Sequence, residues 1–287
     1  MQYPPTELVL NEKGQVYHLG LHPDEVANKI ILVGDQDRVH LVASFFDTIE
    51  HTSQHREFTC KTGTYRGKRI TALSTGIGTD NIDITLNELD ALFNIDLESR
   101  EDKKNITTLD IVRIGTCGIL QADIPVHGYL LSQYAFGLDN IAHFYQIPWS
   151  QDELTILSEI LGQVIMPDHI RPYVAGTSDD LFNRLESDKT HSGITITSSG
   201  FYGPQGRQLR LHNRTQYLND MLSAFSMGKL KIINFEMESS ALFAIGKALG
   251  HHCATICLGI ANRPNKEFSK GYHHEMMGLI EYVLNRL

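Results

Sequence analysis

Short apolar runs alternate along this chain with longer segments of helical spacing, and this alternation constrains the fold more than any other feature. Residues 29–33 and 69–74 read as strands, followed by helical spacing over 37–46 and 80–93. Further strands are expected at 109–114, 129–133, 171–176, 193–198, 230–234 and 253–261, and further helices at 151–165, 213–225, 239–249 and 273–287. The pattern predicts an α/β fold whose mixed, largely parallel central sheet is flanked by helices.

The length of 287 residues is enough for one large domain with its own core, and no segment reads as a linker. We therefore predict a single domain over residues 1–287. Residues 1–16 precede the first strand and are interpreted as an N-terminal extension. Residues 97–107 carry a dense run of charges and are predicted to form an exposed insertion.

The charge balance and the apolar pattern exclude several functions. A formal net charge of -9 repels nucleic-acid phosphates, and no apolar run approaches the ~20 residues that cross a bilayer. The N-terminus lacks a secretory pattern, so a cytoplasmic location is expected. The four cysteines and the adjacent histidine pairs lack metal-site spacing, so neither a metal nor an organic cofactor is predicted.

A turn-rich segment at residues 200–207 places Gln205 and Arg207 two positions apart, behind the aromatic pair Phe201 and Tyr202. An amide offers one donor face and one acceptor face, and a guanidinium offers a fork of donors. Together they match a flat heterocycle with carbonyls beside an N–H, such as uracil. The alternative interpretation is a solvated surface turn.

Two strand ends carry the residues of an anion site. At Gly34-Asp-Gln-Asp-Arg38 the backbone enters a helix, where a glycine permits close approach and the helix N-terminus and arginine supply positive potential. Arg113-Ile-Gly-Thr116 repeats this logic. Taken singly, each arginine also fits a surface ion pair. Neither P-loop nor dinucleotide fingerprint is present, so nucleoside triphosphates and nicotinamide cofactors are not indicated.

The segment Glu236-Met237-Glu238 lies between a strand and the helix expected at 239–249. Its carboxylates can accept hydrogen bonds from sugar hydroxyls while the methionine lies against the apolar face of a ribose. The glutamates also fit a simpler role, in which they complement the dipole of the following helix.

From the order of its motifs, the chain resembles the nucleoside phosphorylase family, and its Gln205-Gly-Arg207 turn is similar to that of the uridine phosphorylase branch. The resemblance covers nearly the whole chain from about Tyr17. It rests on five motifs: Gly34-Asp-x-x-Arg38, Ser74-Thr-Gly-Ile-Gly78, Arg113-Ile-Gly-Thr-x-Gly118, Glu236-Met-Glu238 and Ala261-Asn-Arg263.

The resemblance implies inorganic phosphate as co-substrate and a pocket with three parts. Phosphate would be bound by Gly34, Arg38, Arg113, Thr116 and, from a neighbouring subunit, Arg56. Ribose would be bound by Met237 and Glu238, with Glu236 nearby, and by His18 across the same interface. The base would be bound by Phe201, Gln205 and Arg207. The resemblance also implies a homo-oligomer with active sites shared between subunits, a dimer or a hexamer built from dimers.

Two features depart from the family pattern. The glycine-rich loop continues as Thr79-Asp80-Asn81 where the uridine branch commonly has Gly-Pro-Ser, whose serine helps to hold a monovalent cation together with the glutamate matched by Glu57. A potassium site near Glu57 is therefore in doubt. The excursion at 97–107 is also longer than the usual connection.

The function expected from sequence is the reversible phosphorolysis of uridine, or of deoxyuridine or thymidine, to uracil (or thymine) and the pentose 1-phosphate. Arg113, Gln205 and Arg207 are the expected catalytic residues, the first neutralising phosphate and the others the departing base. Three alternatives remain: a purine or broad-specificity phosphorylase, a hydrolytic nucleosidase of the same fold, and a non-catalytic nucleoside-binding protein.

Overall fold

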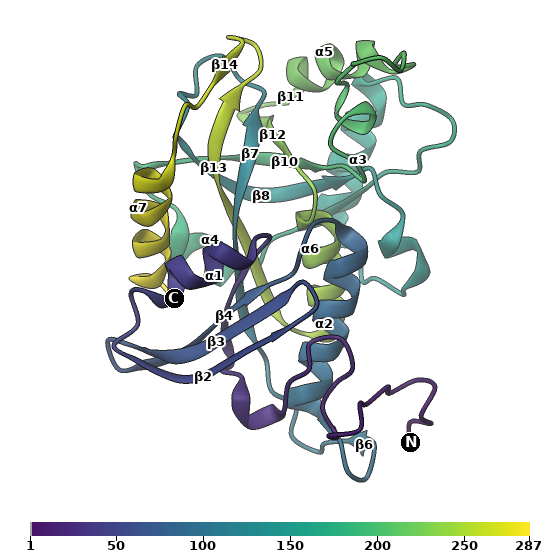
Figure 1. Cartoon of the computed structure of the whole chain (residues 1–287). Helices are drawn as coiled ribbons and strands as arrows, with labels where there is room; N and C mark the ends of the chain where they lie inside the picture. Colours follow the sequence, from purple (N-terminus) through teal and green to yellow (C-terminus); the bar gives the residue numbers. More distant parts are fainter. Residues whose placement is uncertain (1) are drawn as a thin grey trace.

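The computed structural model describes residues 2–287 and contains a large mixed sheet covered by helices on both faces (Figure 1). Its strands are β1 (Lys29–Val33), β2 (Thr48–His55), β3 (Phe58–Tyr65), β4 (Lys68–Ser74), β7 (Asp110–Ile119), β8 (Tyr129–Gly137), β9 (Tyr173–Gly176), β10 (Thr190–Thr197), β11 (Ser226–Met227), β12 (Leu230–Glu236), β13 (His252–Asn262) and β14 (Glu267–Phe268). The helices are α1 (Gln36–Ala43), α2 (Thr79–Asn94), α3 (Gln151–Gln163), α4 (Asp179–Leu185), α5 (Gln216–Ala224), α6 (Ser239–Leu249) and α7 (His273–Leu284), with short 3-10 turns at Pro23–Glu25, Ile141–Phe144 and Gly203–Gln205.

The predicted α/β class and mixed sheet are confirmed, with the parallel pairings at the centre of the sheet. Strand β1 runs parallel to β4 and β7, β13 runs parallel to β7, and β10 runs parallel to β8 and β12. The strands β2, β9, β11 and β14 are joined to the sheet by antiparallel pairings.

One extra pairing closes part of the sheet on itself. The end of β7 lies antiparallel to the end of β12, with Gly118 opposite Phe235 and Ile119 opposite Asn234. Strands β12, β10, β8, β13 and β7 therefore form a ring, because each pairs with the next and the last pairs with the first. This closure brings the Arg113-Ile-Gly-Thr116 segment beside Glu236-Met237-Glu238.

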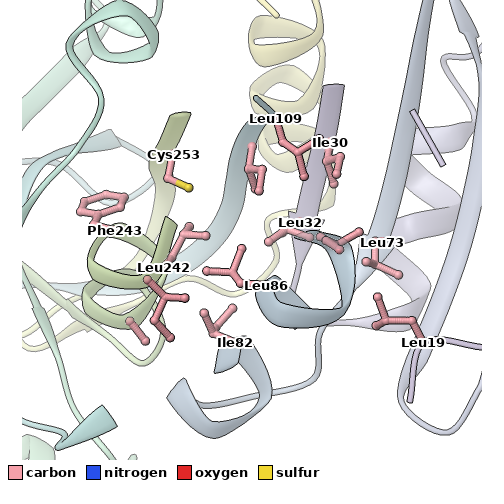
Figure 2. Close-up of a cluster of buried hydrophobic side chains, with 14 of the residues drawn as sticks. Leu19, Ile30, Leu32, Leu73, Ile82, Leu86, Leu109, Leu242, Phe243 and Cys253 are labelled. Atoms are coloured by element: carbon pink, nitrogen blue, oxygen red, sulfur yellow. The ribbon is translucent and has the colours of Figure 1, made fainter. Parts of the chain in front are cut away.

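The buried strands are apolar on both sides, as a sheet covered on both faces requires. Successive residues of a strand point to opposite faces, so Ile30 and Leu32 of β1 pack with α2 and α6 (Figure 2). Ile31 and Val33 pack instead with α1, α4 and α7. Because β1 is packed on both faces, the position of the loop that begins at Gly34 is fixed.

Two predicted element boundaries are wrong in ways that affect the site. The strand expected to stop at Ile114 continues to Ile119, so Gly115 and Thr116 lie within β7 and not in a loop. Gly115 permits this, because a Cβ there would lie 2.2 Å from Nη1 of Arg113. The helix expected from Asn213 begins only at Gln216.

The hairpin of β2 and β3 and the short helix α4 were not predicted. In β2, Thr, Glu, His, Ser and Gln side chains alternate with few apolar ones, and most residues are exposed. A strand without an apolar face gives no clear periodic signal. The hairpin turn is nevertheless informative, since it carries Arg56 and Glu57.

Residues 97–107 belong to a small hairpin, in which β5 (Ile95–Asp96), just before this segment, pairs with β6 (Glu101–Asp102) inside it. The guanidinium of Arg100 donates to the carbonyl oxygens of Tyr3 and Leu8, so this hairpin is tied to the N-terminal extension. Most residues of the 97–107 segment are exposed, and its status as an insertion stays a prediction. No helix within residues 2–287 is long and apolar enough to cross a membrane.

Candidate functional site

A pocket of about 250 Å³ lies where the ends of β1, β7, β12 and β13 meet the 200–207 turn. It brings together nearly all of the predicted phosphate, ribose and base residues. Its lining includes Gly34, Arg38, Arg113, Thr116, Phe201, Gln205, Arg207, Glu236, Met237 and Glu238, together with Asp35, Ile77, Cys117, Gly118, Phe235, Ile260, Ala261 and Phe268.

Arg113 is the central charged group of this pocket and is only 5% exposed. Its Nη2 atom contacts Oε2 of Glu238, and its Nη1 atom lies 3.3 Å from Oε2 of Glu236. Its Nε atom is buried and has no hydrogen-bond partner within residues 2–287. One guanidinium thus links the sheet to the Glu236-Met237-Glu238 segment and retains an unused donor.

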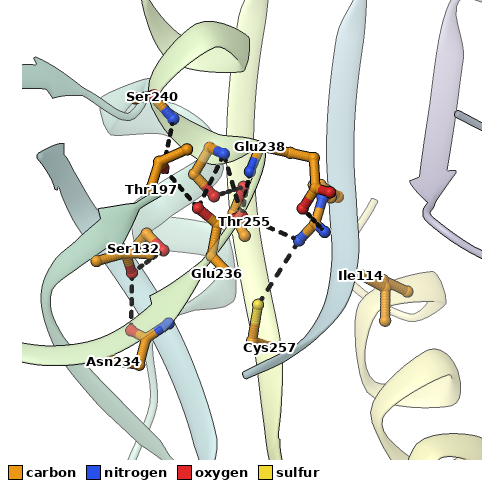
Figure 3. A network of polar contacts seen from close by, with 12 residues as sticks. Ile114, Ser132, Thr197, Asn234, Glu236, Glu238, Ser240, Thr255 and Cys257 are labelled. Carbon is orange, nitrogen blue, oxygen red and sulfur yellow. Dashed lines mark hydrogen bonds and ion pairs between the residues drawn. The ribbon is translucent and has the colours of Figure 1, made fainter. Parts of the chain in front are cut away.

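Both carboxylate oxygens of Glu236 accept hydrogen bonds from neighbouring protein groups (Figure 3). Its Oε1 atom accepts from the hydroxyl of Thr197 at 2.5 Å, and its Oε2 atom accepts from the backbone N–H of Glu238 at 2.9 Å. The backbone N–H of Ser239 lies 3.0 and 3.1 Å from the two oxygens. Glu236 therefore satisfies the first N–H groups of α6, the helix-end role that the sequence left open.

Glu238 differs from Glu236 because its carboxylate also contacts the glycine-rich loop. Its Oε1 atom accepts from the backbone N–H of Gly78 at 2.8 Å, while its Oε2 atom contacts Arg113. Gly78 has a φ of 105°, a conformation that favours glycine. The predicted Ser74-Thr-Gly-Ile-Gly78 motif is thereby connected to the predicted ribose segment.

Burial and the neighbouring opposite charges shift the pKa values of Arg113 and Glu238 in opposite directions. Burial would lower the pKa of Arg113, but the carboxylates of Glu238 and Glu236 outweigh it and raise that pKa above its ordinary range. Burial raises the pKa of Glu238, and Glu236 raises it further, while Arg113 lowers it. Burial is therefore the main reason that the pKa of Glu238 lies above that of an ordinary glutamate, and Arg113, which is shared with Glu236, does not offset it.

Arg38 extends from the first turn of α1 into the same pocket and is 8% exposed. Its Nη1 atom donates to the carbonyl of Ile114 at 3.4 Å, a long bond. Burial lowers the pKa of Arg38, and the nearby charge of Arg113 lowers it further. Two buried guanidinium groups this close favour an anion between them.

The 200–207 turn forms the other end of the pocket. Gln205 is 3% exposed, whereas Phe201 is 49% exposed. The guanidinium of Arg207 stacks on the ring of Phe201 at 3.8 Å and donates to the side-chain oxygen of Gln205. The three predicted base residues are therefore in mutual contact.

Arg263 lies next to the base end of the pocket, in contact with Gln205, and the sequence analysis assigned it no role although it belongs to the Ala261-Asn-Arg263 motif. Its Nη2 atom donates to the backbone carbonyl of Gln205 at 2.6 Å, and its guanidinium lies over the ring of Phe235. Its Nη1 atom is buried without a partner within the described chain. Burial lowers the pKa of Arg263 to about 10, and the charge of Arg207 adds to this effect.

Arg56, Glu57 and His18 do not line the pocket of their own chain. Arg56 is exposed at the β2–β3 turn, where its guanidinium lies 5.4 Å from the centre of the Tyr17 ring. His18 pairs with Glu88 through Nδ1 at 2.7 Å. These residues gather on one surface beside the glycine-rich loop, since Glu57 contacts the position of Gly76.

The doubt about a potassium site near Glu57 stands. The amide of Asn81 lies on the same side of Gly76 as Glu57, so both side chains crowd that position. Within the part of the chain that the structure describes, no group of three or more His, Cys, Asp or Glu residues is arranged to hold a metal ion. Among the charged residues on this side of the loop, the sequence analysis named only Glu57 as a candidate ligand.

Three comparisons agree on the family to which this fold and pocket are similar. The model of the phosphorylase superfamily matches residues 28–280. A uridine phosphorylase of Thermococcus kodakarensis is 27% identical over 278 residues, covering 92% of this chain and 83% of the relative. A DeoD-type purine nucleoside phosphorylase of Oceanobacillus iheyensis is 26% identical over 242 residues, covering 83% and 84%.

Among solved structures, a nucleoside phosphorylase of Trypanosoma brucei, described as showing uridine phosphorylase activity, superimposes with a TM-score of 0.87. It is 28% identical, and the match covers 98% of this chain and 99% of that one. The likeness therefore extends over nearly the whole length of both chains.

Proposed function

The chain belongs to the phosphorylase superfamily, which confirms the resemblance predicted from its sequence, and from this premise we propose that it catalyses the reversible phosphorolysis of uridine. Phosphate would attack C1′ of the nucleoside, the glycosidic C–N bond would break, and uracil and ribose 1-phosphate would leave. The observation that carries the proposal is one pocket of about 250 Å³ with Arg38 and Arg113 at one end and Gln205 and Arg207 at the other.

The first task of the pocket is to hold phosphate beneath C1′. Arg38 and Arg113 are buried guanidinium groups, Nε of Arg113 has no partner within residues 2–287, and Thr116 adds a hydroxyl from the strand that carries Arg113. When phosphate binds, its oxygens compete with Glu238 for Arg113. Glu238 is then available to accept hydrogen bonds from the ribose hydroxyls, with Met237 against the sugar. Bringing both reactants together in one pocket supplies proximity.

The second task is to stabilise the negative charge that grows on the departing base. Gln205 is held by the 3-10 turn and by Arg263, so its amide can be presented to the heterocycle in a fixed orientation. Arg207 is partly buried, and donors in such an environment stabilise developing charge more strongly than donors in water. No side chain needs to become a covalent nucleophile in this reaction.

A purine or broad-specificity phosphorylase is the second candidate, because a purine nucleoside phosphorylase is among the relatives. The loop at residues 259–263 reads Gly-Ile-Ala-Asn-Arg and has no aspartate to protonate a purine ring. Assays of uridine, deoxyuridine, thymidine, inosine and adenosine with orthophosphate test this choice. We expect uridine to have the highest kcat/KM, and a preference for inosine or adenosine would contradict the proposal.

The dependence on phosphate separates phosphorolysis from the other two alternatives. We expect uracil release from uridine to require orthophosphate and to yield ribose 1-phosphate. Release of free ribose without orthophosphate would indicate a hydrolase. Uridine binding with no product under either condition would indicate a non-catalytic binding protein.

We also propose that Arg56 and His18 complete the active site of a second copy of this chain. Both lie outside their own pocket, on the surface beside the glycine-rich loop. Mixing Arg56→Ala and Arg113→Ala subunits tests this arrangement. We expect the mixture to recover part of the activity that each variant lacks, because one site of a mixed dimer is then intact. No recovery after verified subunit exchange would contradict sharing.

A further inference from the structure

A second cavity, of about 960 Å³, lies behind the base end of the pocket and has no role in the proposed reaction. We name it the rear cavity. It lies among the segments 138–140, 169–171 and 199–215 and the helix α5. Its volume falls within the range of about 300–1,000 Å³ that small-molecule sites occupy.

The rear cavity is strongly cationic although the chain carries a net charge of -9. Arg171, Arg207, Arg210 and Arg214 all line it. Within residues 2–287, no carboxylate lies within 4.0 Å of the guanidinium groups of Arg171, Arg210 or Arg214. Positive charges gathered around a cavity without partners attract an anion.

The carboxylate of Asp139 is the only acidic group in the lining of the rear cavity, and it is already occupied. It is 5% exposed and accepts from the hydroxyls of Tyr173 and Ser240, at 2.8 and 2.6 Å, and from the backbone N–H of Ile141 at 2.9 Å. Its charge is therefore directed into the fold and does not neutralise the arginines.

The rest of the lining combines apolar and aromatic side chains with the polar residues Asn140, Ser199, Asn213 and Thr215. Leu209 and Leu211 are highly exposed, and the ring of Tyr202 is 55% exposed beside them. His169 and His212 add two further flat rings. A ligand that suits this mixture has a planar ring for the aromatic wall and a phosphate for the arginines.

We infer that the rear cavity binds a nucleoside 5′-monophosphate, and that this ligand weakens the binding of uridine in the neighbouring pocket. The inference builds on the proposed function, because its effect is exerted on the uridine site. Free phosphate fits the arginines alone, and a free nucleoside fits the aromatic wall alone, whereas the nucleotide uses both.

The coupling between the two sites passes through Arg207, which lines both of them. Phe201 lines the pocket while its neighbour Tyr202 lines the rear cavity, and their rings meet edge to face. The backbone carbonyl of Tyr202 accepts from the N–H groups of Gln205 and Arg207. A phosphate in the rear cavity draws the guanidinium of Arg207 away from the base, so uridine binds less tightly.

Uridine 5′-monophosphate tests the inference when orthophosphate is kept saturating, because the phosphate position of the active site is then occupied. We expect the nucleotide to raise the KM for uridine by about five-fold or more with little change in kcat, a typical size for coupled sites. Arg210→Ala/Arg214→Ala should keep the basal activity and lose this effect. Lys13→Ala/Lys104→Ala, which removes the same charge elsewhere, should retain it.

Calorimetric titrations with uridine 5′-monophosphate, with orthophosphate and with uridine identify the source of binding. We expect the double arginine variant to lose nucleotide binding while its uridine binding is unchanged. The inference is overturned if the nucleotide does not bind the unaltered protein, or if it binds and inhibits the double variant equally well. Should the unaltered protein fail to cleave uridine, the proposed function fails, whereas the titration still decides whether the rear cavity binds nucleotide.

Discussion

The two ends of the active-site pocket are built in different ways. At the phosphate end, Arg113 and Glu238 belong to strands and helix starts, are 5% and 3% exposed, and hold each other directly. At the base end, Phe201 and Arg207 belong to a turn outside the sheet, and Phe201 is 49% exposed. The phosphate end of the pocket is therefore rigid, whereas solvent reaches the base end.

This difference separates the chemistry from the choice of substrate. Strands β1 and β7 are buried on both faces, so the guanidinium of Arg113 cannot move without disturbing the core. The 200–207 turn can change its side chains at small cost to the fold, because loops on a rigid scaffold tolerate substitution. We expect the phosphate end to be intolerant of mutation and the base end to tune specificity.

The largest effect is expected for Arg113→Ala. It removes a phosphate contact and leaves Glu236 and Glu238 buried without their cation, so turnover should fall by about 100-fold or more, equivalent to about 2.7 kcal/mol. Thermal unfolding should also show a loss of about 3–5 kcal/mol. Arg113→Lys is the matched control, which keeps the charge and most of the stability but not the guanidinium fork. Near-normal phosphorolysis by Arg113→Ala would remove the distinction between the two ends.

The next effect concerns pH and Glu238. Because burial raises the pKa of Glu238 above its ordinary value of 4.5, the acid limb of kcat/KM should lie above 4.5. Glu238→Gln should lower activity and abolish this limb. The folded state binds this proton more tightly than the unfolded state, so its stabilising contribution is full below 4.5 and is lost as pH rises through the raised pKa.

The same raised pKa predicts how the stability of the fold changes with pH. With rising pH, the unaltered protein should lose stability relative to Glu238→Gln, whose side chain does not titrate. Chemical denaturation at a series of pH values measures the difference. A difference that grows in the opposite direction would mean that Arg113 outweighs burial, and that Glu238 has a lowered pKa.

A smaller and more selective effect is expected for Gln205→Ala. The substitution removes one base contact and leaves the phosphate end untouched, so the discrimination between uridine and other nucleosides should fall by about 10-fold, or 1.4 kcal/mol. The KM for orthophosphate should change less than two-fold, roughly within error. Equal losses for both substrates would show that the two ends do not act separately.

The smallest effect is expected for Thr197→Val, which removes the hydroxyl that donates to Glu236. The fold should lose about 1–2 kcal/mol, since a buried carboxylate oxygen then lacks one donor. Activity should change little, because Glu236 keeps its backbone donors and Arg113. Serine at position 197 is the control that restores the donor. A large loss of activity with an unchanged fold would instead give Glu236 a direct part in substrate binding.

Much of the fold was predictable because its buried elements carry strong periodic signals. Strand β1 and helix α6 were predicted with their observed bounds, since each is nearly uniformly apolar. The β2–β3 hairpin was not predicted, because its outer strand is polar except for Ile49. The length of β7 was misjudged because Gly115 and Gly118 resemble a loop in sequence, whereas in the structure they allow close packing against Arg113 and Arg263.

Most of the candidate site was also predictable, but its internal pairing was not. Motifs at strand ends indicated that Arg38 and Arg113 would meet, and they line one pocket. The sequence did not reveal that Glu236 caps α6 while Glu238 joins Arg113 to the glycine-rich loop, because both glutamates fit either role. The position of Arg263 next to Gln205 depends on the pairing of β7 with β12 that closes the ring, and this long-range pairing has no local sequence signal.

A crystal structure with orthophosphate and uracil bound together tests the central claim most directly. We predict that phosphate contacts the guanidinium groups of Arg38 and Arg113, that Glu238 turns from Arg113 toward the space between the ligands, and that the edge of uracil meets Gln205 and Arg207. Phosphate bound away from both Arg38 and Arg113, or uracil bound without contact to the 200–207 turn, would contradict the account.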